Sequence, residues 1–262
     1  MFEEIYHEYL NHKNEQNRKE RYEGNEDWYH ASGAGLCSRK LYFESVEKAT
    51  PTNPANKKSM RIMGLGTIVH KELQDSLIYY NNIYNNINCT IKEKKEIPSY
   101  KKKSLENLKF HIEGEVSISS LNVRGFYDVV SQDCSASTTE PITRLHDIKT
   151  IGTFQWGKRF SKTNPVESGH HYLQLGTYGL GIKEQFGSLD EMSLIYYNKD
   201  NSTMRKSVVP LSYVDQAKRY WYNINEEHAK GLPQFRAGTS PVHKWVCNYC
   251  QFKDHCNPPL AF

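Results

Sequence analysis

The sequence predicts an α/β protein in which helices flank a central sheet of mixed strand direction. Three features of the 262-residue chain predict this class. Helical patterns occupy its first third, segments of alternating hydrophobicity fill its middle, and a helix, two further strand candidates and a last helix follow. Elements in this order pack as layers around a shared core. The sequence has no internal repeat of solenoid period.

The first third is typical of three helices separated by turn-forming segments. Polar and charged residues form the first helix, over residues 2–20, and a loop leads to the Ser-Gly-Ala-Gly turn at 32–35. We expect a second helix at 36–46, a linker at 50–58 and a third helix at about 60–80. The third helix is amphipathic, with an apolar face formed by Ile62, Val69, Leu73 and Leu77.

The middle of the chain is typical of a sheet. An Asn-rich run at 81–88 is expected to be a loop or hairpin. Alternating hydrophobicity predicts strands at 89–97, 110–120, 121–130 and 143–150. The polar stretch 131–141 is expected to join two antiparallel neighbours. The pattern ends with a helix at 170–186, strands at 192–198 and 203–209, and a helix at 213–229.

Composition and charge exclude several classes of protein. With 37% hydrophobic and 24% charged residues, the chain is neither disordered nor collagen-like. Its net charge of +4 permits a phosphate-rich partner without requiring one. The N-terminal segment carries acids and has no apolar run, and no stretch reaches the roughly 18–20 apolar residues of a membrane span. We therefore expect a cytoplasmic protein with no membrane partner.

The six cysteines are expected to bind metal or stay reduced, because disulfides are rare in a reducing compartment. Three of them, Cys247, Cys250 and Cys256, form C-x2-C-x5-C near the C-terminus. This spacing indicates a metal centre, since zinc and iron–sulfur clusters prefer thiolate ligands. The spacing alone leaves zinc and an iron–sulfur cluster equally open.

A fourth ligand must come from outside this trio. His243 or His255 would complete a zinc knuckle within the segment. Among the other cysteines Cys37 is the best candidate, because it begins a helix, where backbone amides lower a thiol pKa. With Cys37 the centre would tie the first fifth of the chain to its last residues. We interpret Cys89 and Cys134 as ordinary small hydrophobic residues.

A second group of residues has the chemistry of a hydrolytic metal site. Asp147 and Lys149 stand two apart on one predicted strand, so they share a face, and Asp128 lies on the neighbouring strand. Facing carboxylates suit Mg²⁺ or Mn²⁺, and a lysine beside the ion can position a water and steady a phosphate under attack. His70, on the amphipathic helix, would add a nitrogen ligand that favours Mn²⁺. Each signal also has a non-catalytic explanation. A surface salt bridge explains the D-x-K triplet, and ordinary packing explains the histidine.

Two further groups of residues suit a nucleic-acid partner. Gln174 and Tyr178 lie at i and i+4 on one helix face, where both could bond a phosphate or the active-site groups. Taken alone, this pair is better explained by an ordinary polar stripe on an amphipathic helix. A run that interleaves an aromatic with basic residues resembles a single-strand-binding surface, and a solvated helix face or loop explains it almost as well: Trp156, Lys158, Arg159 and Lys162.

These motifs together resemble the PD-(D/E)XK nuclease superfamily, and within it the RecB-like nucleases with a 4Fe-4S cluster, such as the CRISPR-associated exonucleases and the AddB nuclease domain. GLCSRKLYFE resembles the family's first cysteine motif and GLGTIVHKELQD its histidine helix. GFYDVV and DIKT resemble the G-x-x-D and (D/E)-x-K strands, with Asp147 where many relatives have Glu. QLGTY resembles the Q-x-x-x-Y helix. The likeness runs from about residue 30 to 257.

The resemblance implies one restriction-endonuclease-like nuclease domain over residues 1–262, with an N-terminal helical extension at 1–30 and a core at 31–257. It implies a 4Fe-4S cluster that joins the two ends of the core, held by Cys37, Cys247, Cys250 and Cys256. It implies a Mg²⁺ or Mn²⁺ site formed by His70, Asp128, Asp147 and the backbone carbonyl of Ile148, with Lys149 catalytic. It also implies DNA contacts by Arg39, Gln174 and Tyr178.

The implied activity is a DNA exonuclease that acts on single strands or DNA ends in recombination, repair or phage DNA processing. The sequence contains no G-x-x-x-x-G-K-[ST] motif, so unwinding would need a partner helicase. An annealing or single-strand-binding protein is another expected partner. Two alternatives remain open. One is a non-catalytic nucleic-acid-binding protein with a zinc knuckle, and the other is a nuclease of CRISPR spacer acquisition.

Overall fold

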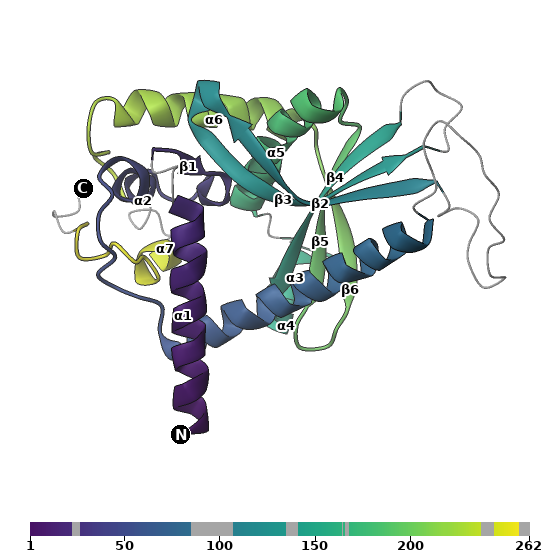
Figure 1. The fold of residues 1–262 in the computed structure, drawn as a ribbon. Helices are drawn as coiled ribbons and strands as arrows, with labels where there is room; N and C mark the ends of the chain where they lie inside the picture. The colour runs from purple at the N-terminus through teal and green to yellow at the C-terminus, as the bar shows by residue number, and fades with distance from the viewer. Residues whose placement is uncertain are drawn as a thin grey trace.

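Within the described residues, the sheet has six strands of mixed direction and carries helices on both faces (Figure 1). The structure is a computed structural model that describes residues 1–22, 27–84, 107–134, 141–163, 165, 168–236 and 244–256. The expected α/β architecture is confirmed. The strands are β1 (Tyr29–His30), β2 (Leu108–Ile118), β3 (Val123–Asp133), β4 (Ile142–Ile151), β5 (Glu191–Asn198) and β6 (Met204–Val209).

Strand β3 organises the sheet because three strands pair with it. β2 runs antiparallel along one edge, whereas β1 and β4 share the other edge. β1 pairs in parallel with Val123 and Arg124, and β4 pairs antiparallel with residues 129–133. In the described ladder, residues 125–128 of β3 therefore have no strand partner on that edge. β5 continues the sheet in parallel with β4, and β6 is antiparallel to β5.

Helices lie on both faces of this sheet. The α-helices of the described residues are α1 (Phe2–Tyr22), α2 (Ser38–Leu41), α3 (Lys57–Tyr84), α4 (Thr153–Arg159), α5 (Gly169–Phe186), α6 (Ser212–His228) and α7 (Lys244–Asn248). Neighbouring side chains of a strand point to opposite faces. In β4, Thr150 lies under Gly66 of α3, whereas Lys149 hydrogen-bonds to Gln174 of α5. Helices α3 and α5 therefore cover opposite faces.

The main core lies between the sheet and the packed pair α5 and α6. A Cβ on Gly176 of α5 would lie 2.2 Å from the carbonyl oxygen of Tyr213 in α6, so only glycine permits this approach. The buried indole of Trp221 donates its N–H to the hydroxyl of Thr177, at 2.8 Å. The bond satisfies a polar atom that would otherwise be costly to bury. This packing fixes α5, which carries part of the candidate site.

Most predicted elements are confirmed, with ends that differ by a few residues. Helix α3 is longer than expected, because it begins at Lys57 within the predicted linker and continues to Tyr84 within the predicted Asn-rich loop. The helix expected at 36–46 is the short α2 followed by a π-helical turn, Tyr42–Val46. Strand β3 continues to Asp133, into the predicted connection. The strand expected at 89–97 lies outside the described residues.

Three elements were not predicted from the sequence. β1 has two residues, α4 has seven and α7 has five, so each is too short to show a period. Short elements of this kind form because tertiary packing stabilises them. The connection between β4 and α5, to which the sequence analysis assigned no element, contains α4.

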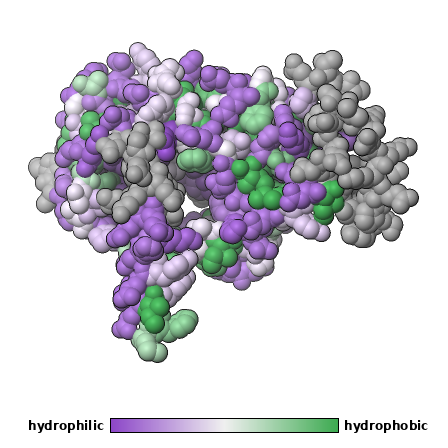
Figure 2. Space-filling model, in the orientation of Figure 1, coloured by the Kyte–Doolittle hydropathy of each residue, from purple (hydrophilic) through white to green (hydrophobic). Residues whose placement is uncertain are grey.

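Helix α1 projects from the rest of the chain, and its free end carries apolar side chains (Figures 1 and 2). Phe2, Ile5 and Tyr9 are exposed there. The helix contacts α3 through a hydrogen bond of 2.7 Å from Arg61 to the Glu3 carboxylate. None of the helices in the described residues combines the length and the apolar character that a membrane span requires.

Candidate functional site

The two strands that carry the predicted acids separate where those acids lie. Pairing of β3 with β4 stops at Val129 and His146, one step before Asp128 and Asp147 would face each other. In place of a backbone bond, the Asp128 carboxylate accepts the Ile148 N–H at 2.6 Å. The separation opens the sheet between the two aspartates. Opposed carboxylates therefore flank a gap in which a cation could sit.

The other edge of β3 is also irregular at Asp128. Strand β2 pairs with β3 on both sides of Glu113, but Glu113 itself is unpaired and has a φ of 53°, a rare conformation for a residue with a side chain. Gln74 of α3 donates to the Glu113 carboxylate at 2.7 Å and approaches the Asp128 carbonyl oxygen at 3.5 Å. Sequence reasoning missed both residues, because nothing in the alternation of β2 marks the interruption.

A chain of polar side chains holds Lys149. Its ammonium lies 2.7 Å from Asp147 Oδ2 and donates to Gln174 Oε1 at 2.9 Å. The Gln174 amide in turn donates to the Tyr178 hydroxyl, again at 2.9 Å. The structure thus brings together the D-x-K strand and the Q-x-x-x-Y helix. Gln174 and Tyr178 are buried and their observed contacts lie within the site, so the DNA contact expected of them stays a prediction.

Gly125 allows Tyr178 to approach β3. A Cβ at this position would lie 2.9 Å from the Tyr178 ring and 2.9 Å from the Ala31 methyl group. Any side chain would therefore push α5 away from the strand. This contact explains in physical terms why a glycine stands three residues before Asp128 in GFYD.

Replacing Gly125 with alanine is expected to destabilise the protein by about 1–3 kcal/mol through this overpacking. DNA cleavage should fall as well, because the displaced Tyr178 supports Gln174. Thermal unfolding measures the first effect. The control is Gly169→Ala, whose Cβ would meet no atom within 4 Å. Equal losses of stability in the two variants would contradict the overpacking.

The electrostatics of the gap favour a bound cation. Asp147 is 2% exposed, and burial raises the pKa of its carboxyl, an effect that nearby Asp128 increases and Lys149 opposes. His70 Nδ1 lies 3.6 Å from Asp128 Oδ1. Burial alone would lower the pKa of His70, but the Asp128 and Asp147 carboxylates outweigh it and raise that pKa. A divalent ion would stabilise the ionised carboxylates directly.

The donor chemistry at this gap fits Mg²⁺ or Mn²⁺. Asp147 Oδ2 is buried, and within the described residues it has no hydrogen-bond partner beyond its ion pair with the Lys149 ammonium. A buried carboxylate oxygen with this deficit is a ready ligand. His70 and Asp128 face each other at a distance too long for a hydrogen bond. In the described part of the chain, however, no three His, Cys, Asp or Glu side chains are already closed around one point. The donors would have to draw together around an ion.

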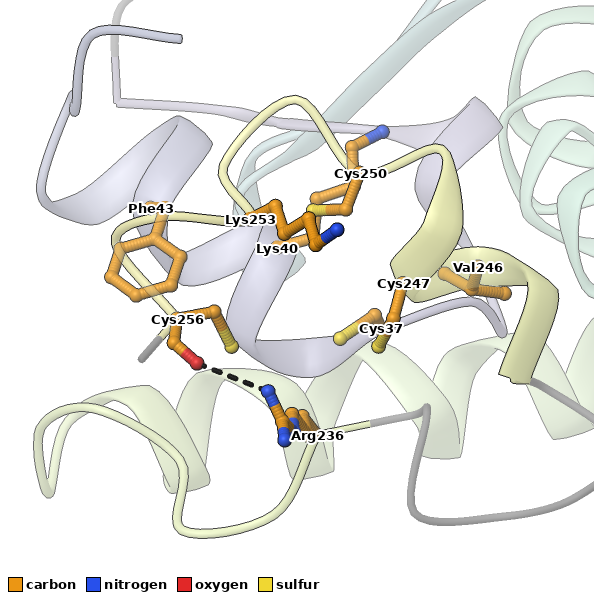
Figure 3. Close-up of a pocket in the computed structure, with 9 residues that line it drawn as sticks. All are labelled: Cys37, Lys40, Phe43, Arg236, Val246, Cys247, Cys250, Lys253 and Cys256. Atoms are coloured by element: carbon orange, nitrogen blue, oxygen red, sulfur yellow. Dashed lines mark hydrogen bonds between the residues drawn. The ribbon is translucent and has the colours of Figure 1, made fainter. Parts of the chain in front are cut away.

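The four predicted cluster cysteines line one small cavity (Figure 3). Cys37 immediately precedes α2, while the other three come from the segment that begins with α7. All four are free thiols. Burial raises the pKa of Cys250, and the nearby Cys37 and Cys256 raise it further. The structure therefore brings the two ends of the core together at these cysteines, with Cys37, the preferred candidate for the fourth ligand, beside the C-terminal three.

The surroundings of these cysteines are cationic. Lys40, Arg236 and Lys253 also line the cavity, and Arg236 donates to the Cys256 carbonyl oxygen at 3.3 Å. Positive groups stabilise thiolates, so they lower the pKa of nearby thiols. They also offset the negative charge of a centre that is held by thiolates. The donor set and its surroundings therefore fit a negatively charged metal centre.

Arg39 is placed against these cysteines. It is 4% exposed, and its Nε donates to Cys256 Sγ at 3.2 Å while Nη1 donates to the Pro233 carbonyl at 2.6 Å. The observed contacts of Arg39 are therefore with the cysteine segment, and the DNA contact expected of it stays a prediction. His255, a candidate zinc ligand, contacts the Thr50 carbonyl at 2.7 Å and is not among the residues that line the cavity. His243 and Cys89 lie outside the described residues.

Two sequence expectations need correction. Cys134, at the end of β3, is disulfide-bonded, so it is neither reduced nor an ordinary small hydrophobic residue. In the aromatic and basic run, Trp156 packs against the core and Arg159 is buried, where it hydrogen-bonds to the Tyr172 hydroxyl. Only Lys158 and Lys162 of the four are exposed.

The fold and the geometry of this gap define a hydrolytic nuclease framework, and comparison with known families identifies it. The model of the PD-(D/E)XK nuclease superfamily matches residues 32–257. The chain belongs to the PD-(D/E)XK nuclease superfamily. Nucleases of this superfamily typically use divalent metals such as Mg²⁺ or Mn²⁺ and act on DNA.

Solved structures resemble this chain at low sequence identity. One is SSO0001, with 17% identity, a TM-score of 0.50 and coverage of 98% of both chains. Another is a candidate exonuclease from Eubacterium rectale, with 12% identity, a TM-score of 0.48 and coverage of 86% of this chain and 91% of the other. The likeness to SSO0001 shows a shared fold. Comparison with curated proteins gave no match.

Proposed function

We propose that this nuclease is a Mg²⁺- or Mn²⁺-dependent DNA exonuclease of the RecB-like type, acting on single strands or DNA ends. The observation that carries the proposal is the gap between β3 and β4, where Asp128, Asp147 and Lys149 meet beside His70. A buried acidic pair next to a held lysine has the parts that phosphodiester hydrolysis needs. The nuclease unit would span residues 31–257, with residues 1–30 as an extension.

Each residue has a role in this proposal. Asp128, Asp147, His70 and the Ile148 carbonyl would hold the divalent ion, which supplies Lewis-acid stabilisation of the phosphate and of the attacking water. Lys149 orients that water and offsets charge on the phosphate. Gln174 and Tyr178 are positioning residues, since they fix the Lys149 ammonium through two successive hydrogen bonds.

We further propose that Cys37, Cys247, Cys250 and Cys256 hold a 4Fe-4S cluster with a structural role. The four cysteines line one cavity, which supports a centre with four thiolate ligands. One observation supports a cluster over a zinc knuckle that includes a histidine. His255 is directed to Thr50 instead of the cavity. Because the centre would close a long loop of chain, it would stabilise the fold.

A cleavage assay tests the proposed activity. Purified protein is mixed with end-labelled single-stranded or double-stranded DNA and with Mn²⁺, Mg²⁺ or EDTA. We expect mononucleotides or short products with either ion and intact DNA in EDTA. Circular single-stranded DNA should resist degradation if the enzyme requires a DNA end. Cleavage of the circular DNA would overturn the exonuclease assignment. Intact DNA under every condition would overturn the proposed activity.

The same preparation, purified without oxygen, tests the metal centre. We expect a brown protein that contains iron and sulfide in a ratio near that of a cluster. Zinc without iron, together with no Mn²⁺-stimulated degradation, would favour a non-catalytic nucleic-acid-binding protein with a zinc knuckle. The pathway in which the nuclease acts, and any helicase or annealing partner, would then be sought with the active enzyme.

A further inference from the structure

We infer that the outer face of α4, formed by Phe154 and Lys158, binds the unpaired bases and phosphates of a single DNA strand beside the catalytic gap. The inference rests on the proposed function and adds to it a second, non-catalytic contact. Phe154 is 71% exposed, so its ring is available to a base. Lys158 Nζ lies 4.4 Å from the centre of its ring.

The inner face of α4 shows why Phe154 must point outward. Trp156 and Phe160 stack on each other with ring centres 4.6 Å apart, and Phe160 packs edge-on against Tyr196 of β5. In a helix, residues 154 and 158 lie on one side and are offset from 156 and 160. The aromatic that the sequence offered for stacking, Trp156, is therefore used in packing, and Phe154 is presented to solvent.

Contacts through Tyr196 place α4 next to the catalytic lysine. Tyr196 is the register partner of Lys149 in the parallel pair β4 and β5. Phe160 rests on Tyr196, so the helix sits over the end of this strand pair. Phe154 follows Lys149 by five residues, which limits their separation to about 18 Å. A strand held at the gap could cover that distance with about five stacked nucleotides.

The charge around Phe154 suits a polyanion. Lys158 and Lys162 are exposed on the same connection, and the exposed Arg205 of β6 lies over the Phe160 ring at 4.6 Å. The Asp200 carboxylate accepts the Thr153 N–H at 2.7 Å, at the start of α4. Exposed aromatic rings stack with any base, and neighbouring cations bind the backbone, which gives affinity for single strands without sequence preference. A protein partner would not need this pairing of ring and cation.

Binding of a labelled oligothymidylate in Ca²⁺, measured by fluorescence anisotropy, tests the inference. Phe154→Ala should weaken binding by about 5- to 100-fold, the loss of one stacked base. Phe154→Trp should restore it, and Lys158→Gln should weaken it and reduce its salt dependence. The control is Tyr222→Ala, which removes an equally isolated aromatic, 60% exposed, from α6. This control should bind as the unmodified protein does.

Two further probes separate stacking from other effects. An abasic strand of equal length should bind the unmodified protein and Phe154→Ala equally, as should a blunt duplex. Unchanged oligothymidylate affinity in Phe154→Ala, with cleavage intact, would overturn this inference and leave the proposed function standing. A change of oligomeric state in Phe154→Ala, without a change in DNA affinity, would show instead that the ring contacts protein. Failure of the unmodified protein to bind or cleave DNA would overturn both.

Discussion

Replacing Lys149 with alanine is expected to reduce DNA cleavage by about 10²- to 10⁴-fold, the range associated with loss of a catalytic acid–base group or of one electrostatic contact to the transition state. The ammonium is held between Asp147 and Gln174, at 2.7 and 2.9 Å. No other lysine in the described residues makes both contacts. The rate constant with excess enzyme measures the chemical step separately from binding.

The structure also predicts what Lys149→Ala should not change. Binding of single-stranded DNA in Ca²⁺ should persist, because the residue is proposed to act on the reacting phosphate. The brown colour should persist as well, since the cysteines lie on other elements. Lys206→Ala is a matched control, because it removes a lysine from the edge strand β6 of the same sheet, where it pairs with Glu191. Cleavage by Lys149→Ala at the rate of this control would remove Lys149 from the mechanism.

Loss of Lys149 has a second expected effect, which involves the metal. Asp147 would be left as a buried carboxylate without its cationic partner, and breaking such a pair is destabilising. Mg²⁺ or Mn²⁺ should then raise the melting temperature of Lys149→Ala more than that of the unmodified protein. The ion would replace a charge that the side chain otherwise provides. An equal shift in both proteins would argue against an ion next to Asp147.

The catalytic strands were predictable because strand period fixes which side chains share a face. Asp147 and Lys149 are two residues apart on β4, so their side chains lie on the same face of the strand. The gap that opens beside them was not predictable. It depends on where β3 stops pairing with β4 and on the left-handed Glu113 in β2, and neither follows from local preference. Pairing between distant segments decides both.

Arg39 shows the same limit at the cysteine cavity. In sequence it stands two residues after Cys37 in a motif of a DNA-processing family, so a DNA contact is a reasonable expectation. In the structure it bonds to a sulfur atom 217 residues away. Helix phase sets a similar limit at α4, where the packing of Trp156 determines that Phe154 faces solvent. A seven-residue helix has too few turns to reveal which face it buries.

Replacing Cys250 with serine is expected to remove the metal centre and with it the solubility of the protein. Cys250 packs near the small core of Phe43, Phe252 and Cys256, which is separate from the main core. Among the described residues, the segment that begins with α7 contributes no strand to the sheet. The proposed cluster would therefore supply much of the free energy that holds the C-terminal segment in place. Iron content, absorbance and the soluble fraction after expression measure the effect.

The matched comparison is between Cys37→Ser and His255→Ala. Cys37 lies more than two hundred residues before Cys250, yet both face one cavity, so either serine variant should lose iron to the same extent. His255→Ala should keep its iron, because the ring is directed to Thr50. Retention of iron in Cys37→Ser, with loss in His255→Ala, would move the fourth ligand to the histidine. The centre would then close a loop of a few residues and could no longer tie the N-terminal helices to the C-terminal segment.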